Sequence, residues 1–238
     1  MKKKTRWPIY LIIGLIITFI AFTVPLPYYI EVPGTSEDIR KVLQVNNQPD
    51  QEEGSYQFVT VGVKHARLVD LVYAWLTPFT DIRSAKEMTG GSSDTEYMRI
   101  NQFYMETSQN MAKYQGLKTA GKEIELKYLG VYVLTVTDNS TFKGILNIAD
   151  TVTAVNDKTF ESSKEMVDYV NSQTLGDKVK VTYQEDGKVK TAEGKIITLE
   201  NGKNGIGIGL IDRTEVSSDV PIKFSTAGIG GPSAGLMF

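Results

Sequence analysis

The sequence has no cysteine and only one histidine, His65, among its 238 residues. Without cysteine, neither a disulfide framework nor a thiolate zinc site is possible. A single histidine leaves few general bases, and no cluster of metal-ligand side chains stands out, so we predict neither a metal nor another cofactor. The formal net charge of −2 gives no basic footprint for nucleic acid, which we exclude as a partner.

A nucleotide-binding motif is also missing. Residues 205–209, Gly-Ile-Gly-Ile-Gly, are rich in glycine, but a phosphate-binding fingerprint needs a strand before it and a helix after it. The residues that follow are Leu210-Ile211-Asp212 and then a β-rich stretch from Val216 to Phe224. We therefore interpret 205–209 as part of a β-hairpin or bulge and predict no nucleotide partner.

The amino terminus carries the longest apolar run of the chain. Lys2, Lys3, Lys4 and Arg6 precede an apolar stretch over residues 9–26. That length is near the lower limit for a helix that spans a bilayer, and the basic cluster would stay inside. We predict a single-pass anchor in the cell membrane, with the bulk of the chain outside the cytoplasm. A cleaved signal peptide is the alternative, although prolines stand where small residues would be needed for cleavage.

Residues 28–122 mix extended and helical patterns. Apolar residues at Leu68, Val72 and Leu76 share a helical face that Pro78 ends. Ser93 with Glu96 forms a capping box for a long helix that runs to about residue 120. We predict that both apolar faces pack in a core.

From residue 123 to residue 199 the pattern is that of a small β-rich unit. Alternating apolar residues lead to Leu129-Gly130, Asp186-Gly187 is a strong hairpin signal, and Ser162 with Glu165 caps a helix. The order of elements resembles a bacterial PDZ domain. Four segments carry this resemblance: Tyr128-Leu129-Gly130-Val131, Ile148-Ala149-Asp150-Thr151-Val152, Val155-Asn156-Asp157 and Gly176-Asp177-Lys178-Val179.

The PDZ resemblance implies a groove in which an extended peptide adds as a strand between a strand edge and a helix. Leu129, Gly130, Val131 and Val133 would then line the strand side, and Met166, Val167 and Val170 the helix side. A spacer domain of the same fold that binds nothing is the alternative.

The last residues, Gly-Gly-Pro-Ser-Ala-Gly-Leu-Met-Phe over 230–238, contain a lone Ser233 at a Gly-Pro turn. A hydroxyl exposed beside free backbone N–H groups can act as an acyl-transfer nucleophile when a base is near. The segment satisfies the Gly-x-Ser-x-Gly elbow of α/β-hydrolases, but that fold needs an acid and a histidine after the serine. No histidine follows Ser233, so we reject that interpretation.

The pentapeptide Gly-Pro-Ser-Ala-Gly, residues 231–235, resembles the nucleophile motif of Lon-like Ser–Lys peptidases. With the apolar amino terminus, residues 27–34, Ser108-Gln109 and the PDZ-like segment, the whole chain resembles the membrane-anchored, PDZ-containing Lon-like serine proteases of Gram-positive bacteria. This resemblance implies that Ser233 is the nucleophile and that the turn residues beside it form the oxyanion site: Gly230, Gly231, Pro232 and Ala234. The family's general-base lysine lies beyond the serine, where this sequence has no residue, so we expect a fragment that is inactive as it stands.

The sequence thus predicts an α+β chain in four parts. These are a basic tip and transmembrane anchor (1–27), a strand and helix region (28–122), a PDZ-like domain (123–199) and the incomplete start of a Lon-like protease domain (200–238). The predicted function of the full-length form is an ATP-independent serine endopeptidase that cleaves exported peptides or proteins recruited by the PDZ-like domain. The alternative is a membrane-tethered, PDZ-type peptide-binding adaptor without catalysis.

Overall fold

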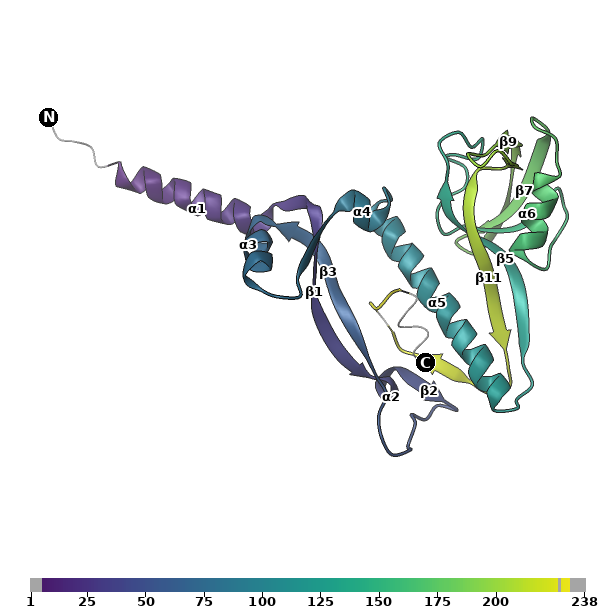
Figure 1. Ribbon diagram of the computed structural model, residues 1–238, viewed down its shortest axis with the longest axis horizontal. Coiled ribbons are helices and arrows are strands. Elements are labelled where there is room, and N and C mark those ends of the chain that lie inside the picture. The colour runs from purple at the N-terminus through teal and green to yellow at the C-terminus, as the bar shows by residue number, and fades with distance from the viewer. Residues whose placement is uncertain (1–5, 227, 232–238) are drawn as a thin grey trace. The chain divides into compact units, whose positions relative to one another are not determined.

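The computed structural model describes residues 6–226 and 228–231 (Figure 1). The chain forms two compact units. Unit 1 contains residues up to 37 together with 57–94, and unit 2 contains residues 38–56 together with the chain from Thr95 onward. Each unit is thus built from two separate stretches of sequence.

Unit 1 contains a three-stranded sheet in the order β3-β1-β4. Its strands are β1 (Pro25–Asp38), β3 (Gln57–Arg67) and β4 (Asp81–Ser84). β1 and β4 are antiparallel, with Tyr28 opposite Ser84 and Glu31 opposite Asp81. The helices of this unit are α1 (Trp7–Thr23), α3 (Leu68–Leu76) and α4 (Ala85–Thr89). The predicted helix that Pro78 ends corresponds to α3.

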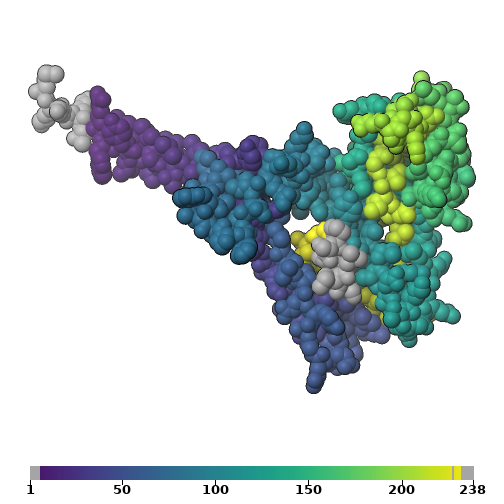
Figure 2. All heavy atoms as spheres, in the orientation of Figure 1, coloured from purple at the N-terminus to yellow at the C-terminus, as the bar shows by residue number. Residues whose placement is uncertain are grey.

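The predicted transmembrane helix is wrong. Helix α1 is 17 residues long, because the backbone becomes extended at Val24 and β1 begins at Pro25. Within residues 6–226 and 228–231, no helix is long and apolar enough to cross a membrane. The side chains of α1, purple in Figure 2, are largely exposed.

Unit 2 contains the long helix α5 (Asp94–Thr119), whose first residue belongs to unit 1, and a small two-stranded sheet. In this sheet β2 (Leu43–Val45), which follows the short helix α2 (Ile39–Val42), pairs with β12 (Ile222–Phe224). The strands are antiparallel, with Ile222 opposite Val45 and Phe224 opposite Leu43. Two segments that are far apart in the sequence are therefore joined.

The larger part of unit 2 is a five-stranded antiparallel sheet in the order β11-β5-β6-β7-β8. Its strands are β5 (Glu125–Val136), β6 (Thr151–Val155), β7 (Lys178–Glu185), β8 (Lys188–Lys195) and β11 (Ile208–Ser217). The helix α6 (Ser163–Asn171) and the two-residue strands β9 (Ile197–Thr198) and β10 (Asn204–Gly205) complete it. β11 lies beyond residue 199, so the sheet continues past the predicted end of the PDZ-like segment.

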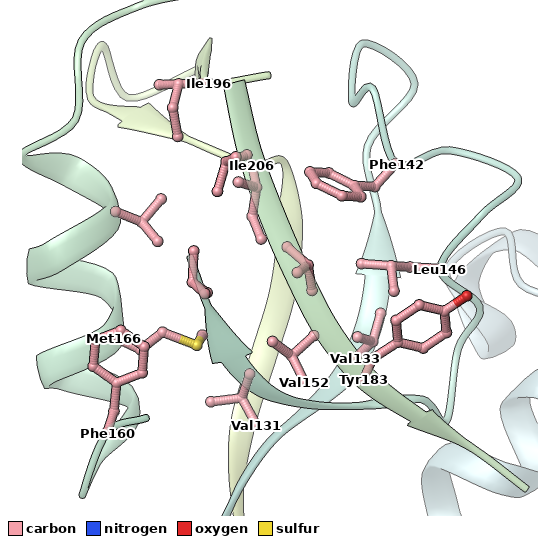
Figure 3. Close-up of a cluster of buried hydrophobic side chains, with 14 residues drawn as sticks. Val131, Val133, Phe142, Leu146, Val152, Phe160, Met166, Tyr183, Ile196 and Ile206 are labelled. Carbon is pink, nitrogen blue, oxygen red and sulfur yellow. The ribbon is translucent and has the colours of Figure 1, made fainter. Parts of the chain in front are cut away.

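Apolar side chains of the strands and of α6 form one buried core (Figure 3). Val131 and Val133 from β5, Val152 from β6 and Met166 from α6 all contribute to it. Phe142, from the segment between β5 and β6, is fully buried in the same cluster. The predicted hairpin is present, because Asp186 and Gly187 join β7 to β8 with φ values of 47° and 77°.

The other face of the sheet contacts α5. The Phe103 ring of α5 stacks on the Tyr132 ring of β5, with 3.6 Å between ring centroids and 8° between ring planes. Both residues are buried. Such a contact buries a large apolar area on each partner. The long helix is therefore part of the same unit as the β-rich sheet.

Candidate peptide-binding site

Strand β11 forms one edge of the five-stranded sheet. It pairs along its length with β5, from Ile208 opposite Val136 to Ser217 opposite Glu125. In the part of the chain that the structure describes, no other strand pairs with β11. A strand with one open edge can accept an added strand.

Helix α6 is attached beside this edge strand at both of its ends. Ser162 caps α6, because its hydroxyl accepts from the Glu165 N–H at 3.2 Å, as the sequence predicts. The Ser163 N–H donates to Asp212 Oδ1 of β11 at 2.9 Å. After the last turn of the helix, the Gln173 carbonyl accepts from Asn204 Nδ2 at 2.7 Å. α6 and β11 therefore run in opposite directions along each other.

The loop that leads into β11 accepts hydrogen bonds from the segment after β5. Ser140 Oγ donates to the Ile206 carbonyl at 2.6 Å, and the Thr137 N–H donates to the Gly207 carbonyl at 2.8 Å. Gly207 has a φ of 75°, and a Cβ there would lie 2.6 Å from Thr137 Oγ1. Only glycine fits this backbone without a shift.

The carbonyls of this loop are bonded, but two of its N–H groups are not. Ile206 and Gly207 are buried, and their backbone N–H groups have no acceptor among the described residues. Buried N–H groups normally find a partner, and two adjacent free N–H groups suit a carboxylate. We call the loop 204–207, β11 residues 208–212 and helix α6 together the β11–α6 site.

The residues predicted to line the strand side lie one strand further in. Leu129, Gly130, Val131 and Val133 belong to β5, which pairs with β11 on one edge and with β6 on the other. Val131 and Val133 are fully buried core residues. The open edge therefore belongs to β11, and the structure does not bring these four residues to it.

Gly130 has a structural reason to be glycine. Its φ is 129°, and a Cβ there would lie 2.2 Å from the Val152 carbonyl oxygen of β6. A side chain at this position would push β5 and β6 apart. Gly130 therefore permits close approach of two strands inside the sheet.

The residues predicted for the helix side do lie on α6, beside β11. Met166 and Val170 are buried and contribute to the core, whereas Val167 is half-buried. Ile208 and Leu210 of β11 and Tyr169 of α6 are partly buried and pack against the same core. The β11–α6 site therefore has an apolar floor.

Polar groups gather where α6 begins. Burial, followed by the negative charges of Asp212 and Glu165, raises the pKa of Tyr128 to about 12. The Tyr128 hydroxyl oxygen is buried, and it has no hydrogen-bond partner within the described ranges.

Asp150 is buried next to β6, and this burial raises its pKa. The hydrogen bond that Asp150 accepts from the Asn147 N–H opposes this shift. In the described residues, no group of three or more His, Asp or Glu side chains could hold a metal.

The predicted catalytic segment is described only in part. Ser233, Pro232 and Ala234 lie outside the described residues. Gly230 and Gly231 are described, and the Gly231 N–H donates to the Asn101 carbonyl of α5 at 2.9 Å. The structure therefore reaches the predicted turn but not the predicted nucleophile.

An antiparallel sheet with a helix beside its edge strand and a glycine-rich loop before that strand defines a small β-rich domain. A family model described as "PDZ domain" matches residues 102–196. This part of the chain is therefore a PDZ domain. The match begins inside α5, which the sequence patterns alone assigned to a separate region.

Solved structures, two of them described as PDZ domains, are similar to part of the chain. The PDZ domain of the SdrC-like protein from Listeria monocytogenes is 35% identical, and the match covers 37% of this chain and 93% of that one, with a TM-score of 0.35. The corresponding domain from Listeria innocua is 38% identical over 34% of this chain and 92% of that one, with a TM-score of 0.33. A Geobacillus thermodenitrificans structure is 30% identical over 34% and 94%, with a TM-score of 0.31. No curated protein matches the chain.

The sequence patterns do not identify the glycine-rich loop before β11 as part of a candidate binding site. Gly205-Ile206-Gly207-Ile208-Gly209 is interpreted from them as part of a β-hairpin or bulge, because a β-rich stretch and not a helix follows it. The available signal was a glycine-rich turn followed by an apolar strand and not by a helix. In a PDZ context that pattern suits carboxylate capture by backbone N–H groups.

Proposed function

We propose that this chain binds the carboxyl-terminal segment of a peptide or protein at the β11–α6 site. The peptide adds to the outer edge of β11 as an antiparallel strand, and its terminal carboxylate accepts from the N–H groups of Ile206 and Gly207. The observation that carries this proposal is a pair of buried N–H groups that have no acceptor among the described residues, at the start of a strand whose outer edge is unpaired in the same part of the chain.

The apolar floor sets the expected preference for the last residue of the peptide. Ile208, Leu210 and Val167 surround the place where the terminal side chain would lie. Burial of an aliphatic or aromatic side chain there would contribute about 1.5–3 kcal/mol. We therefore expect peptides that end in an apolar residue to bind most tightly.

A matched pair of valine substitutions tests the site. Val167→Asp places a charge on α6 beside β11, whereas Val189→Asp places one on β8 at the opposite edge, where the side chain is exposed. Affinity for a peptide with an apolar carboxyl terminus, measured by calorimetry, should fall at least about tenfold in Val167→Asp and stay unchanged in Val189→Asp. Equal affinities in both variants would refute the site.

We further propose that Ser233 is the nucleophile of a serine endopeptidase that acts on exported peptides or proteins bound by the PDZ domain. Two features support this second proposal: the Gly-Pro-Ser-Ala-Gly motif in the sequence and the ordered turn at Gly230 and Gly231 before it. Location outside the cytoplasm, which an exported substrate requires, stays a prediction. In the full-length form, cleavage of a labelled unfolded protein should be lost in Ser233→Ala, and cleavage that persists in that variant would exclude Ser233 as the nucleophile.

A further inference from the structure

The segment before Ser233 is attached to unit 2 at several points. The Asn46 N–H donates to the Pro221 carbonyl at 2.8 Å, and the Ser225 N–H donates to the Val42 carbonyl at 2.7 Å, so β12 is fixed at both ends. Lys113 Nζ of α5 lies 5.2 Å from the centre of the Phe224 ring. Thr226, Gly230 and Gly231 then make contacts with α5.

Gln109 provides the first of these contacts. Its side chain is on α5 and the residue is buried, 8% exposed, and Nε2 donates to Thr226 Oγ1 at 3.1 Å. The Thr226 carbonyl accepts from the Ile229 N–H at 3.0 Å, which closes a turn. A buried amide needs its partner, so the loss of the Thr226 hydroxyl would leave Gln109 Nε2 unsatisfied.

Asn101, two helical turns earlier on α5, provides the second contact. Its carbonyl accepts from the Gly231 N–H at 2.9 Å. A Cβ at Gly230 would lie 3.1 Å from Asn101 Cβ, so a side chain there would force the segment away from the helix. Gly231 has a φ of 103°, which favours glycine. The two glycines therefore allow the backbone at 230–231 to lie close to Asn101 of α5.

We infer that α5 is the platform that positions the described residues leading to Ser233, from Thr226 to Gly231, with Gln109 as the positioning side chain and Asn101 as the backbone anchor. This inference rests on the proposed protease function, because it concerns how the nucleophile is delivered. Neither residue is a catalytic residue. Each acts through its hydrogen bond to Thr226 or to Gly231, which lie before the proposed nucleophile in the sequence.

The same helix also holds the end of the peptide-binding strand. Asn110, next to Gln109 in the sequence, donates from Nδ2 to the Thr214 carbonyl of β11 at 3.0 Å. Adjacent positions of α5 thus bond to β11 and to the segment before Ser233. α5 therefore contacts both β11 and the described residues before Ser233.

Hydrogen exchange of the Ile229 and Gly231 amides tests the positioning directly. Thr226→Val keeps the shape of the side chain but removes the hydroxyl, whereas Thr226→Ser keeps the hydroxyl. Exchange at both amides should rise about fivefold in Thr226→Val and in Gln109→Leu, the loss expected for one hydrogen bond. Exchange in Thr226→Ser should match that of the unmodified chain. Gln102→Leu, at a more exposed position of α5, is the control and should leave exchange unchanged.

A second readout separates this inference from the protease proposal. If Ser233 is the nucleophile, kcat of the full-length form for labelled casein should fall in Thr226→Val with KM unchanged, and Thr226→Ser should restore it. Unchanged exchange at Ile229 and Gly231 in both Thr226→Val and Gln109→Leu would overturn the positioning role, whatever the activity. Raised exchange with casein cleavage unaffected by Ser233→Ala would support the platform and reject the protease.

Discussion

The two units of the chain differ in how many of their apolar side chains are buried. In unit 2, fourteen apolar side chains form one buried cluster that includes Phe142, with no exposed surface. In the described residues of unit 1, the buried apolar side chains are Tyr29, Ile30, Phe58 and Ala66. Large side chains of that unit, such as Phe79 with 87% of its surface exposed, contact solvent.

This difference indicates which unit can act as a scaffold. Burial of apolar area is the dominant favourable term in folding, so the PDZ domain should have most of the local stability. A recognition site needs such support, because its strand edge and its free N–H groups must be held in place before a ligand arrives. The β11–α6 site lies on the unit that has this core.

The largest expected difference in stability is between two phenylalanine substitutions, one in each unit. Phe142→Ala opens a cavity in the PDZ core and should destabilise it by about 3–5 kcal/mol. Phe79→Ala in unit 1 removes an exposed ring and should change stability by less than about 0.5 kcal/mol. Hydrogen exchange of the slowest amides in each unit measures both values. Similar costs at the two positions would break the comparison between the units.

Two glycine substitutions test how closely β5 and β6 approach each other in the sheet. Gly130→Ala should destabilise the PDZ domain by about 2–3 kcal/mol, because the new Cβ meets the Val152 carbonyl. Gly176→Ala is the control: its φ is 87°, but nothing lies within 4 Å of the new Cβ. Gly176→Ala should therefore cost only about 1 kcal/mol from backbone strain. Urea unfolding of both variants gives the difference, and equal costs would show that the contact with β6 is not tight.

Tyr128→Phe should have a small effect at neutral pH and a distinct one at alkaline pH. The buried hydroxyl has no hydrogen-bond partner among the described residues, so its removal should be neutral or stabilising by up to about 1 kcal/mol. The folded-state pKa of Tyr128 is raised to about 12, above its usual value near 10. The folded state therefore holds the proton more tightly, and stability should be lost as the pH rises from about 10 to about 12. Unfolding curves for the two proteins should diverge in that window, and parallel curves would contradict the burial of this hydroxyl.

The smallest effect concerns a polar cluster of unit 1. Asp94 accepts from the Tyr29 hydroxyl and contacts His65 Nε2 at 2.5 Å, and these hydrogen bonds, that of Tyr29 first, lower the pKa of Asp94. Its contribution to stability is thus present above the unfolded pKa and lost as the pH falls. Tyr29→Phe should raise the pKa of Asp94 toward its usual value in an NMR titration. His65→Gln should raise it less, and an unchanged pKa in Tyr29→Phe would exclude the hydroxyl as the main cause.

The sequence was sufficient for the PDZ elements that local signals define. The Asp186-Gly187 hairpin and the Ser162 cap are set by turn and capping chemistry, and both are present. Strand order is a different matter. The pattern at 129–133 predicts a strand, but it does not say that a strand from 208–217 pairs with it and takes the sheet edge. The strand side of the groove was therefore placed on β5.

Two other features differ from the sequence predictions or could not be predicted: where the first helix ends and what the long helix packs against. The apolar run at 9–26 predicts one long helix, but the backbone becomes extended before Pro25, and the helix ends at Thr23. The long helix near residue 100 was predicted well, but its contact with the sheet depends on the Phe103–Tyr132 stack, which no periodicity reveals. Ser233 stays a prediction, because the motif lies outside the described residues.

The central claim is that β11, and not β5 or β8, is the strand that accepts a peptide. An NMR titration with one apolar-ended peptide, once with a free carboxylate and once with a carboxamide, tests it most directly. With the free carboxylate, the amide signals of Ile206, Gly207 and β11 residues 208–212 should shift together with those of α6. The carboxamide should bind at least about tenfold more weakly. Shifts confined to β8, or equal affinity for the two peptides, would contradict the claim.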